Sequence, residues 1–260
     1  MLQAKKNHLL SNLIVYGLII IFFFILIIVN VDYVKKQLYD TFIYKNSYKK
    51  IIEGLINTLT IASGGLIIGI FIGLIISIVD VSKSQKLIVI TLKKGMKLYV
   101  TLMRGTPITV QLLVIYYIIL SSLSGQEVLI ALIAMGLNSG AYVAEIMRGG
   151  IGAVEIGQHE AGRSLGLNYS QTMIHIIFPQ AFKNVLPSVG NEFISLIKET
   201  SVVGFIGALD LTLAFRKIAT SNYTIEVPYL ILGLSYFFIV FIITRILKKI
   251  ERKLAESDRN

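Results

Sequence analysis

The chain has 260 residues, 55% of them apolar, and its mean hydropathy of +0.74 indicates an integral membrane protein. It has no cysteine, which excludes disulfides, thiolate metal sites and cysteine nucleophiles, and its three histidines are scattered without metal-ligand spacing. A net charge of +10 would suit nucleic acid in a soluble protein, but in a membrane protein it indicates basic cytoplasmic loops, so we expect no nucleic-acid partner.

Six apolar segments predict membrane spans, because each is near the roughly 20 residues that cross a bilayer. They are residues 13–30, 54–79, 107–123, 128–147, 186–209 and 228–247. Nothing in lipid satisfies an open backbone, so all six are expected to be helical. The first follows a basic start, as in a signal peptide, but no small-residue cleavage site comes after it, which predicts a retained helix. The expected fold is an all-α integral membrane bundle of several spans.

The loop charges predict the orientation of these spans. Segments 1–12, 80–107, 148–185 and 245–260 together hold 17 Lys and Arg, whereas the alternate segments 31–53, 121–127 and 208–227 hold 7. Basic residues accumulate on the cytoplasmic side of a membrane. We therefore expect both termini and the connector at residues 155–187 to be cytoplasmic.

Two features of the first half predict packing and membrane contact. Gly65, Gly69 and Gly73 repeat at a spacing of four on one face of the second span, which lets two helix backbones approach closely. The segment 87–103 is apolar on one side and carries three lysines between residues 93 and 97. Because lysine is costly at membrane depth, this pattern predicts a helix in the inner interface.

Polar residues inside the third and fourth spans leave two interpretations open. Gln111 lies one turn into the third span, where it could form an interhelix hydrogen bond or line a transport path. Glu145 and Arg148 lie three residues apart near the inner end of the fourth span, which predicts a local ion pair.

The fifth span carries three ionisable residues, Glu192, Lys198 and Glu199, which are costly in a membrane and must face protein or water. Glu192 and Glu199 are seven residues apart, hence on nearly the same face, with Ser195 between them. That face would suit the ammonium group of a passing solute. The alternative is an internal pair of Lys198 with an acidic neighbour.

The connector at residues 155–187 predicts two short helices rather than a slack loop. The first covers residues 158–165 and ends at Gly166, a suitable left-handed cap. The second covers residues 171–177, with Asn168 and Ser170 as possible N-cap residues and Pro179 as its stop. Two capped helices in a loop indicate a docking surface.

This connector resembles the EAA signature of ABC importer permeases: Glu-Ala-Ala, three residues, Gly, nine residues, Ile, one residue, Leu-Pro. The matching residues are Glu160, Ala161, Gly162, Gly166, Ile176, Phe178 and Pro179, where Gly162 replaces the third Ala and Phe178 replaces Leu. Segments 54–62, 104–112, 141–151, 157–166 and 178–201 also look like permeases of the polar amino acid uptake group. The similarity covers roughly residues 51–250.

The resemblance implies a type I importer in a bacterial plasma membrane, with two permease subunits, two ABC ATPase subunits and an extracytoplasmic amino acid-binding protein. It implies a five-span core at residues 51–250, preceded by an additional N-terminal transmembrane helix with its outer loop at residues 1–50. Residues 251–260 would be a cytoplasmic tail. Whether the two permeases form a homodimer or a heterodimer is left open.

The same resemblance assigns a transport role rather than an enzymatic one. The sequence has no G-x-x-x-x-G-K-[ST] phosphate loop, so ATP and Mg are expected on the ATPase subunit and no cofactor is expected in this chain. The first connector helix would be the coupling helix, with Glu160 facing a basic group of the ATPase. Ala161, Gly162 and Gly166 would allow close approach there, next to the signature residue Pro179.

We expect no catalytic or metal-binding residues and place Glu192, Ser195, Glu199 and Gln111 as candidates for the solute pathway. A secondary amino acid transporter is the alternative function. It would require internal repeats and ion coupling of its own, and the sequence contains no such repeat.

Overall fold

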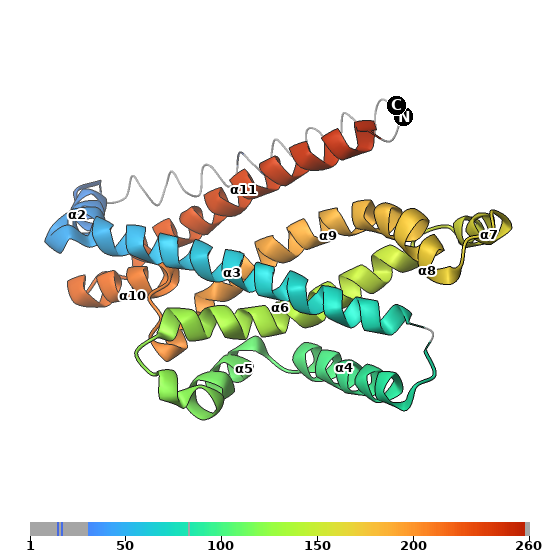
Figure 1. Ribbon diagram of the computed structural model, residues 1–260. Helices are drawn as coiled ribbons and strands as arrows, with labels where there is room; N and C mark the ends of the chain where they lie inside the picture. The colour runs from blue at the N-terminus through green and yellow to red at the C-terminus, as the bar shows by residue number, and fades with distance from the viewer. Residues whose placement is uncertain (1–14, 16, 18–30, 83, 258–260) are drawn as a thin grey trace.

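The computed structural model describes residues 15, 17, 31–82 and 84–257, so the predicted span 13–30 lies almost wholly outside the described residues. Every regular element of the described chain is helical, which confirms the all-α prediction (Figure 1). The α-helices are α2 (Val31–Phe42), α3 (Ser47–Val81), α4 (Leu87–Gly105), α5 (Ile108–Val114), α6 (Glu127–Gly152), α7 (Ile156–Ser164), α8 (Tyr169–Thr172), α9 (Phe178–Glu199), α10 (Leu211–Asn222) and α11 (Glu226–Ser257). Two π-helical turns, Ile115–Ile119 and Met173–Ile177, and three 3₁₀ turns, Tyr44–Asn46, Ser121–Leu123 and Thr200–Ile206, complete them.

Three described helices are long and apolar enough to cross a membrane: Tyr44–Val81, Glu127–Gly152 and Glu226–Arg252. They contain the whole of the predicted spans 54–79, 128–147 and 228–247, so these predictions are confirmed. The segment 31–53, predicted as an outer loop, is mostly helical, because α2 and the first turns of α3 occupy it.

The predicted third span, 107–123, is also wrong as a straight helix. Leu87–Gly105 and Ile108–Ile119 are bent by 113° at the break between them, so the two together form at most one broken span. The break falls at Thr106 and Pro107. Proline pushes the preceding residue out of the helical region, and Thr106 is extended at φ −122° and ψ 149°.

The charged fifth span begins earlier than predicted. Instead of covering residues 186–209, α9 starts at Phe178 and ends at Glu199, followed by the 3₁₀ turn Thr200–Ile206. It does not reach the apolarity of the other three spans, yet it lies between α6 and α11 in the bundle (Figure 1). A methyl group added at Gly190 would meet Leu247 of α11 at 2.9 Å, which shows how closely α9 approaches α11.

The predicted glycine face of α3 is confirmed as a packing surface. A Cβ atom placed on Gly69 would lie 2.7 Å from the Ser139 hydroxyl, and one on Gly73 would lie 2.6 Å from Val143, both in α6. The contact is reciprocal, because Gly136 and Gly140 of α6 receive side chains of α3 in the same way. The α3–α6 pair is therefore the tightly packed centre that positions the other helices.

The bundle has two distinct ends. Helices α7 and α8 lie at one end together with the C-terminal end of α11, and we call it the α7 end (Figure 1). Helices α2 and α10 lie at the opposite end (Figure 1). The connector that resembles a permease signature thus shares its end with the basic C-terminal part of the chain, as the loop charges predict.

Candidate functional site

The first connector helix is α7, and it ends as predicted. Gly166 has φ +77°, and its N–H donates to Arg163 O at 2.9 Å while the Leu167 N–H donates to Gly162 O at 3.1 Å. This pair of bonds is a Schellman cap, which needs a left-handed residue at the position of Gly166. The side chains of Ile156 and Leu165 are 76% and 77% exposed, so α7 presents an uncovered apolar surface.

The second connector helix starts as predicted but does not stop. Asn168 caps α8 through a reciprocal capping box, in which its side chain accepts from the Gln171 N–H and the Gln171 side chain accepts from the Asn168 N–H, both at 2.9 Å. Ser170 is not the cap. Pro179 lies in the first turn of α9, where proline is tolerated, and the π-helical turn Met173–Ile177 joins α8 to α9. The predicted stop at Pro179 is therefore wrong.

Gly162 faces its own chain. It is buried, and a Cβ atom there would lie 2.6 Å from Cγ2 and 2.8 Å from Oγ1 of Thr172 in α8. Glycine replaces the alanine of the signature here because a side chain would collide with Thr172. The close approach that Gly162 permits is therefore between α7 and α8 of this chain, rather than with a partner subunit. Glu160 and Ala161 are exposed, and the Glu160 carboxylate has no hydrogen-bond or ion-pair partner among the described residues.

The connector is anchored to three helices of the bundle. The Tyr169 hydroxyl donates to Val81 O at the end of α3 at 3.0 Å, and the Gln180 amide of α9 donates to the Gln158 side chain of α7 at 3.2 Å. A small apolar core joins the connector to the ends of α6 and α9; its buried members are Val154, Met173, Ile177 and Ala181. The connector is therefore a packed unit rather than a slack loop.

The charged residues of α9 have a polar neighbour in α6. Glu192 Oε1 accepts a hydrogen bond from the Ser139 hydroxyl at 2.8 Å, and Ser139 is fully buried. Ser195 and Glu199 are partly buried and Lys198 is exposed. In the described residues, no ion pair joins Lys198 to either glutamate, so the internal pair that the sequence left as an alternative is not formed in this structure.

Gln111 braces the bend between α4 and α5. Its Nε2 donates to Met103 O at 2.7 Å and to the Thr106 hydroxyl at 2.8 Å, while its Oε1 accepts from Asn138 Nδ2 of α6 at 2.8 Å. Both ends of this buried amide are therefore used within the chain. This arrangement is the interhelix hydrogen bond that the sequence left open.

The predicted ion pair of Glu145 and Arg148 is present at 3.1 Å, and it belongs to a longer chain that sequence reasoning missed. Glu145 also pairs with Arg104 of α4, and Arg148 with Asp80 of α3, each at 3.4 Å. All four side chains are partly exposed, so each pair contributes little free energy by itself. Together they connect α4, α6 and α3 near the α7 end.

Comparisons with known proteins place these elements in a family. Residues 86–256 match the family described as binding-protein-dependent transport system inner membrane component. The chain is 38% identical over 210 residues to the arginine transport system permease protein ArtQ of Bacillus subtilis, covering 80% of this chain and 94% of that protein. It is 36% identical over 208 residues to the putative glutamine transport system permease protein GlnP of Rickettsia typhi, covering 78% and 92%.

Two solved structures have a similar fold. The crystal structure of an amino acid ABC transporter with histidines matches with a TM-score of 0.73 and 38% identity, over 79% of this chain and 94% of that one. An inward-facing MetNI methionine ABC transporter matches with a TM-score of 0.70 over 82% of this chain and 99% of that one. The second is only 17% identical, so it supports the fold alone.

Proposed function

This chain belongs to the binding-protein-dependent transport system inner membrane components, so it is a membrane permease subunit of an ABC importer rather than an enzyme, and we propose that its solute is a polar amino acid. The relatives at 36–38% identity are named for arginine and glutamine transport, and the structure at 38% identity is an amino acid transporter. A secondary transporter is not supported, because the family is that of binding-protein-dependent transport systems and the solved structure at 38% identity is an ABC transporter.

Within that importer, we propose that α7 docks on the ATPase subunit and transmits its movement to the spans. The observation that carries this proposal is the continuous helical path from Tyr169 through the π turn to Glu199, which begins beside α7 and ends within the bundle. Because α7 is capped and anchored, a push on it would move α9 as a lever, a hinge-type change driven by nucleotide. ATP and Mg would bind the ATPase, and this chain would need no cofactor.

We propose that the α7 end is cytoplasmic and that two permease copies, identical or different, form the transporter. The excess of Lys and Arg in segments 80–107, 148–185 and 245–260 supports this orientation. The opposite end, with α2 and α10, would then face the amino acid-binding protein. In a bacterial plasma membrane, the binding protein would then supply the solute from outside, and the ATPase subunits would hydrolyse ATP in the cytoplasm.

We propose that Glu192, Ser195 and Glu199 line the solute pathway. None of the ion pairs among the described residues includes Glu192 or Glu199, so an ammonium group could pair with either carboxylate. Gln111 is better explained as the brace of the α4–α5 bend, since its hydrogen bonds are satisfied within the chain.

The docking role is tested by Glu160→Lys in the permease reconstituted with its ATPase subunits and binding protein. The substitution should abolish co-purification of the ATPase and solute-stimulated ATP hydrolysis, because it replaces an exposed unpartnered carboxylate by a cation. Glu53→Lys makes the same charge change on exposed surface in α3, far along the helix from Val81, and should retain the ATPase. Normal coupling in Glu160→Lys would refute the docking role.

The pathway role is tested by Glu192→Gln together with Glu199→Gln. Glutamine keeps an acceptor for Ser139 while removing the charge, so the bundle should assemble normally. Uptake of a cationic or zwitterionic amino acid should fall about tenfold or more, because hydrogen bonds to charged groups are among the stronger ones. Unchanged uptake, with ATPase assembly intact, would remove these residues from the pathway.

A further inference from the structure

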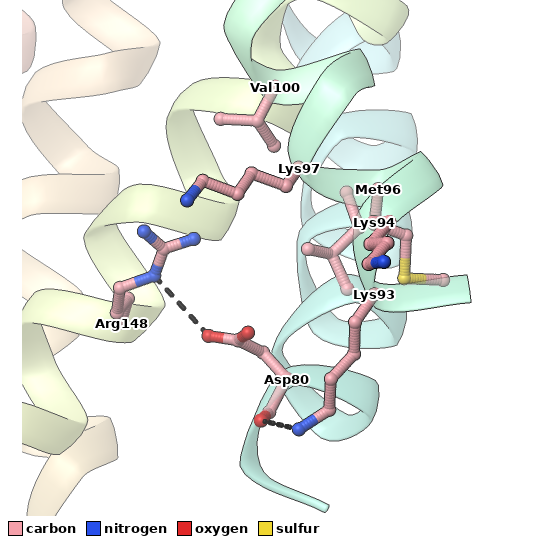
Figure 2. A pocket seen from close by; sticks show the side chains of 8 residues that line it. Asp80, Lys93, Lys94, Met96, Lys97, Val100 and Arg148 are labelled. Carbon is pink, nitrogen blue, oxygen red and sulfur yellow. Dashed lines mark hydrogen bonds and ion pairs between the residues drawn. The ribbon is translucent and has the colours of Figure 1, made fainter. Parts of the chain in front are cut away.

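A basic pocket lies between α3, α4 and α6 near the α7 end. It has a volume of about 320 Å³ and is lined by Ile76, Asp80, Lys93, Lys94, Met96, Lys97, Val100 and Arg148 (Figure 2). Four of these side chains are cationic and one is anionic. The pocket therefore has a surplus of positive charge in its walls.

The cations of the pocket are unequally satisfied. Lys93 Nζ donates to Asp80 O at 2.7 Å and to Ser82 O at 2.6 Å, where it caps the C-terminal carbonyls of α3. Arg148 shares its charge between Asp80 and Glu145. Within residues 31–82 and 84–257, no hydrogen bond or ion pair involves the amines of Lys94 and Lys97.

Lys97 of α4 and Arg148 of α6 line the same pocket and are placed to share an anion. Figure 2 shows the Lys97 amine directed toward the Arg148 guanidinium, so two like charges face each other across the pocket. The Asp80 carboxylate lies on the far side of Arg148 from Lys97 in that view, where it pairs with the guanidinium at 3.4 Å. Two cations in one pocket repel each other, and an anion bound between them would offset that repulsion. A phosphate oxygen could accept from both groups at once.

The apolar part of the pocket indicates what carries that phosphate. Ile76, Met96 and Val100 line the same hollow, and α4 beside it exposes Ile88, Leu98 and Leu102, which are 68%, 60% and 53% accessible. A free anion gains no binding free energy from these apolar surfaces, whereas an acyl chain that covers them removes apolar area from water, which is favourable. Basic pockets between membrane helices at a cytoplasmic face are suited to anionic headgroups.

We propose that this pocket binds the phosphate of an anionic phospholipid, with Lys97 and Arg148 as its main ligands and Lys94 at the rim. The proposal rests on membrane insertion and not on the identity of the solute. A neighbouring hollow shares Asp80, Lys93 and Lys94 with the pocket and includes Val81 and Tyr169. The lipid would therefore lie beside the hydrogen bond that anchors the connector to α3.

The test measures lipid retention by native mass spectrometry of the full permease with its ATPase subunits. Phosphatidylglycerol and phosphatidylcholine are added in separate arms, and inorganic phosphate is added as a competitor. Lys94→Gln with Lys97→Gln should weaken phosphatidylglycerol binding roughly 10- to 30-fold, since each basic side chain near an anionic headgroup contributes to binding. Lys248→Gln with Lys249→Gln removes the same charge from the basic face of α11 and should leave that binding within about twofold.

A second variant reverses the sign of the effect. Asp80→Asn removes the carboxylate that competes for Arg148 and should strengthen phosphatidylglycerol binding. Thermal unfolding without lipid should occur at the same or a slightly higher temperature in the Lys94/Lys97 variant than in the wild type, because neither amine makes a contact that is lost and the repulsion between Lys97 and Arg148 is removed. Equal loss in both lysine pairs, equal retention of phosphatidylcholine, or displacement by equimolar inorganic phosphate would overturn the proposal.

Discussion

Substitution of Gly162 by alanine tests the packing that gives the connector its shape. The added Cβ would lie 2.6 Å from Cγ2 and 2.8 Å from Oγ1 of Thr172, which is 2% exposed. Rotation of the threonine does not relieve the contact, because both branches of this stiff side chain are close to the new atom. Helix α7 must therefore move away from α8, at a cost of about 1–3 kcal/mol for overpacking.

Hydrogen exchange of residues 156–168 measures this cost, because opening of α7 exposes the amides of its Schellman cap. Each 1.4 kcal/mol corresponds to about tenfold faster exchange, and solute-stimulated ATP hydrolysis should fall with it. Gly157→Ala is the matched control in the same helix, since its Cβ meets nothing within 4 Å and alanine favours the helix.

A double substitution separates packing from helix propensity. Thr172→Ala removes the two nearest atoms that the new Cβ meets and leaves Ile176 Cδ1 at 3.2 Å, the far end of a flexible side chain. Adding Gly162→Ala to Thr172→Ala should therefore cost much less than Gly162→Ala does in the wild type. The reasoning is refuted if Gly162→Ala exchanges at the wild-type rate, or if Thr172→Ala fails to suppress its effect.

Two further substitutions test local packing and capping. Gly69→Ala should destabilise the permease by about 1–3 kcal/mol, because its Cβ would lie 2.7 Å from the Ser139 hydroxyl. Gly95→Ala is the control, since its Cβ meets nothing within 4 Å and the substitution should be neutral or stabilising. Thermal unfolding in nanodiscs compares the two variants, and equal unfolding midpoints would contradict the α3–α6 contact. Asn168→Ala should cost about 0.5–2 kcal/mol of local stability and Ser170→Ala nearly nothing, since only Asn168 caps α8. Hydrogen exchange that is faster in the Ser170 variant than in the Asn168 variant would contradict this assignment of the cap.

The connector shows how far local chemistry could be predicted. Gly166 and Asn168 were identifiable from sequence because a left-handed cap and an N-cap depend on the residue and its near neighbours alone. The continuation of the helix through Pro179 could not be predicted from sequence, because the π turn before it depends on how Met173 and Ile177 pack against the ends of α3 and α6. A proline signal predicts a break, and here tertiary contacts carry the helix past it.

Some contacts of the charged residues were likewise predictable from sequence, and others were not. The Glu145–Arg148 pair follows from a spacing of three on one helix and was predictable. Its extension to Asp80 and Arg104 joins three separate helices, and Glu192 meets Ser139 across 53 positions of sequence. No periodicity within one span specifies which residue of another span lies opposite.

The sequence by itself determined the membrane class, the all-α fold, the glycine face of α3 and the permease signature of the connector, because hydropathy, helical spacing and turn chemistry are local properties of the chain. Only the tertiary structure decided that Gly162 faces Thr172, that Gln111 braces the α4–α5 bend, and that Lys97 and Arg148 share a pocket. These arrangements depend on which helix faces come together, and that choice is made by the shape and packing of all the spans at once.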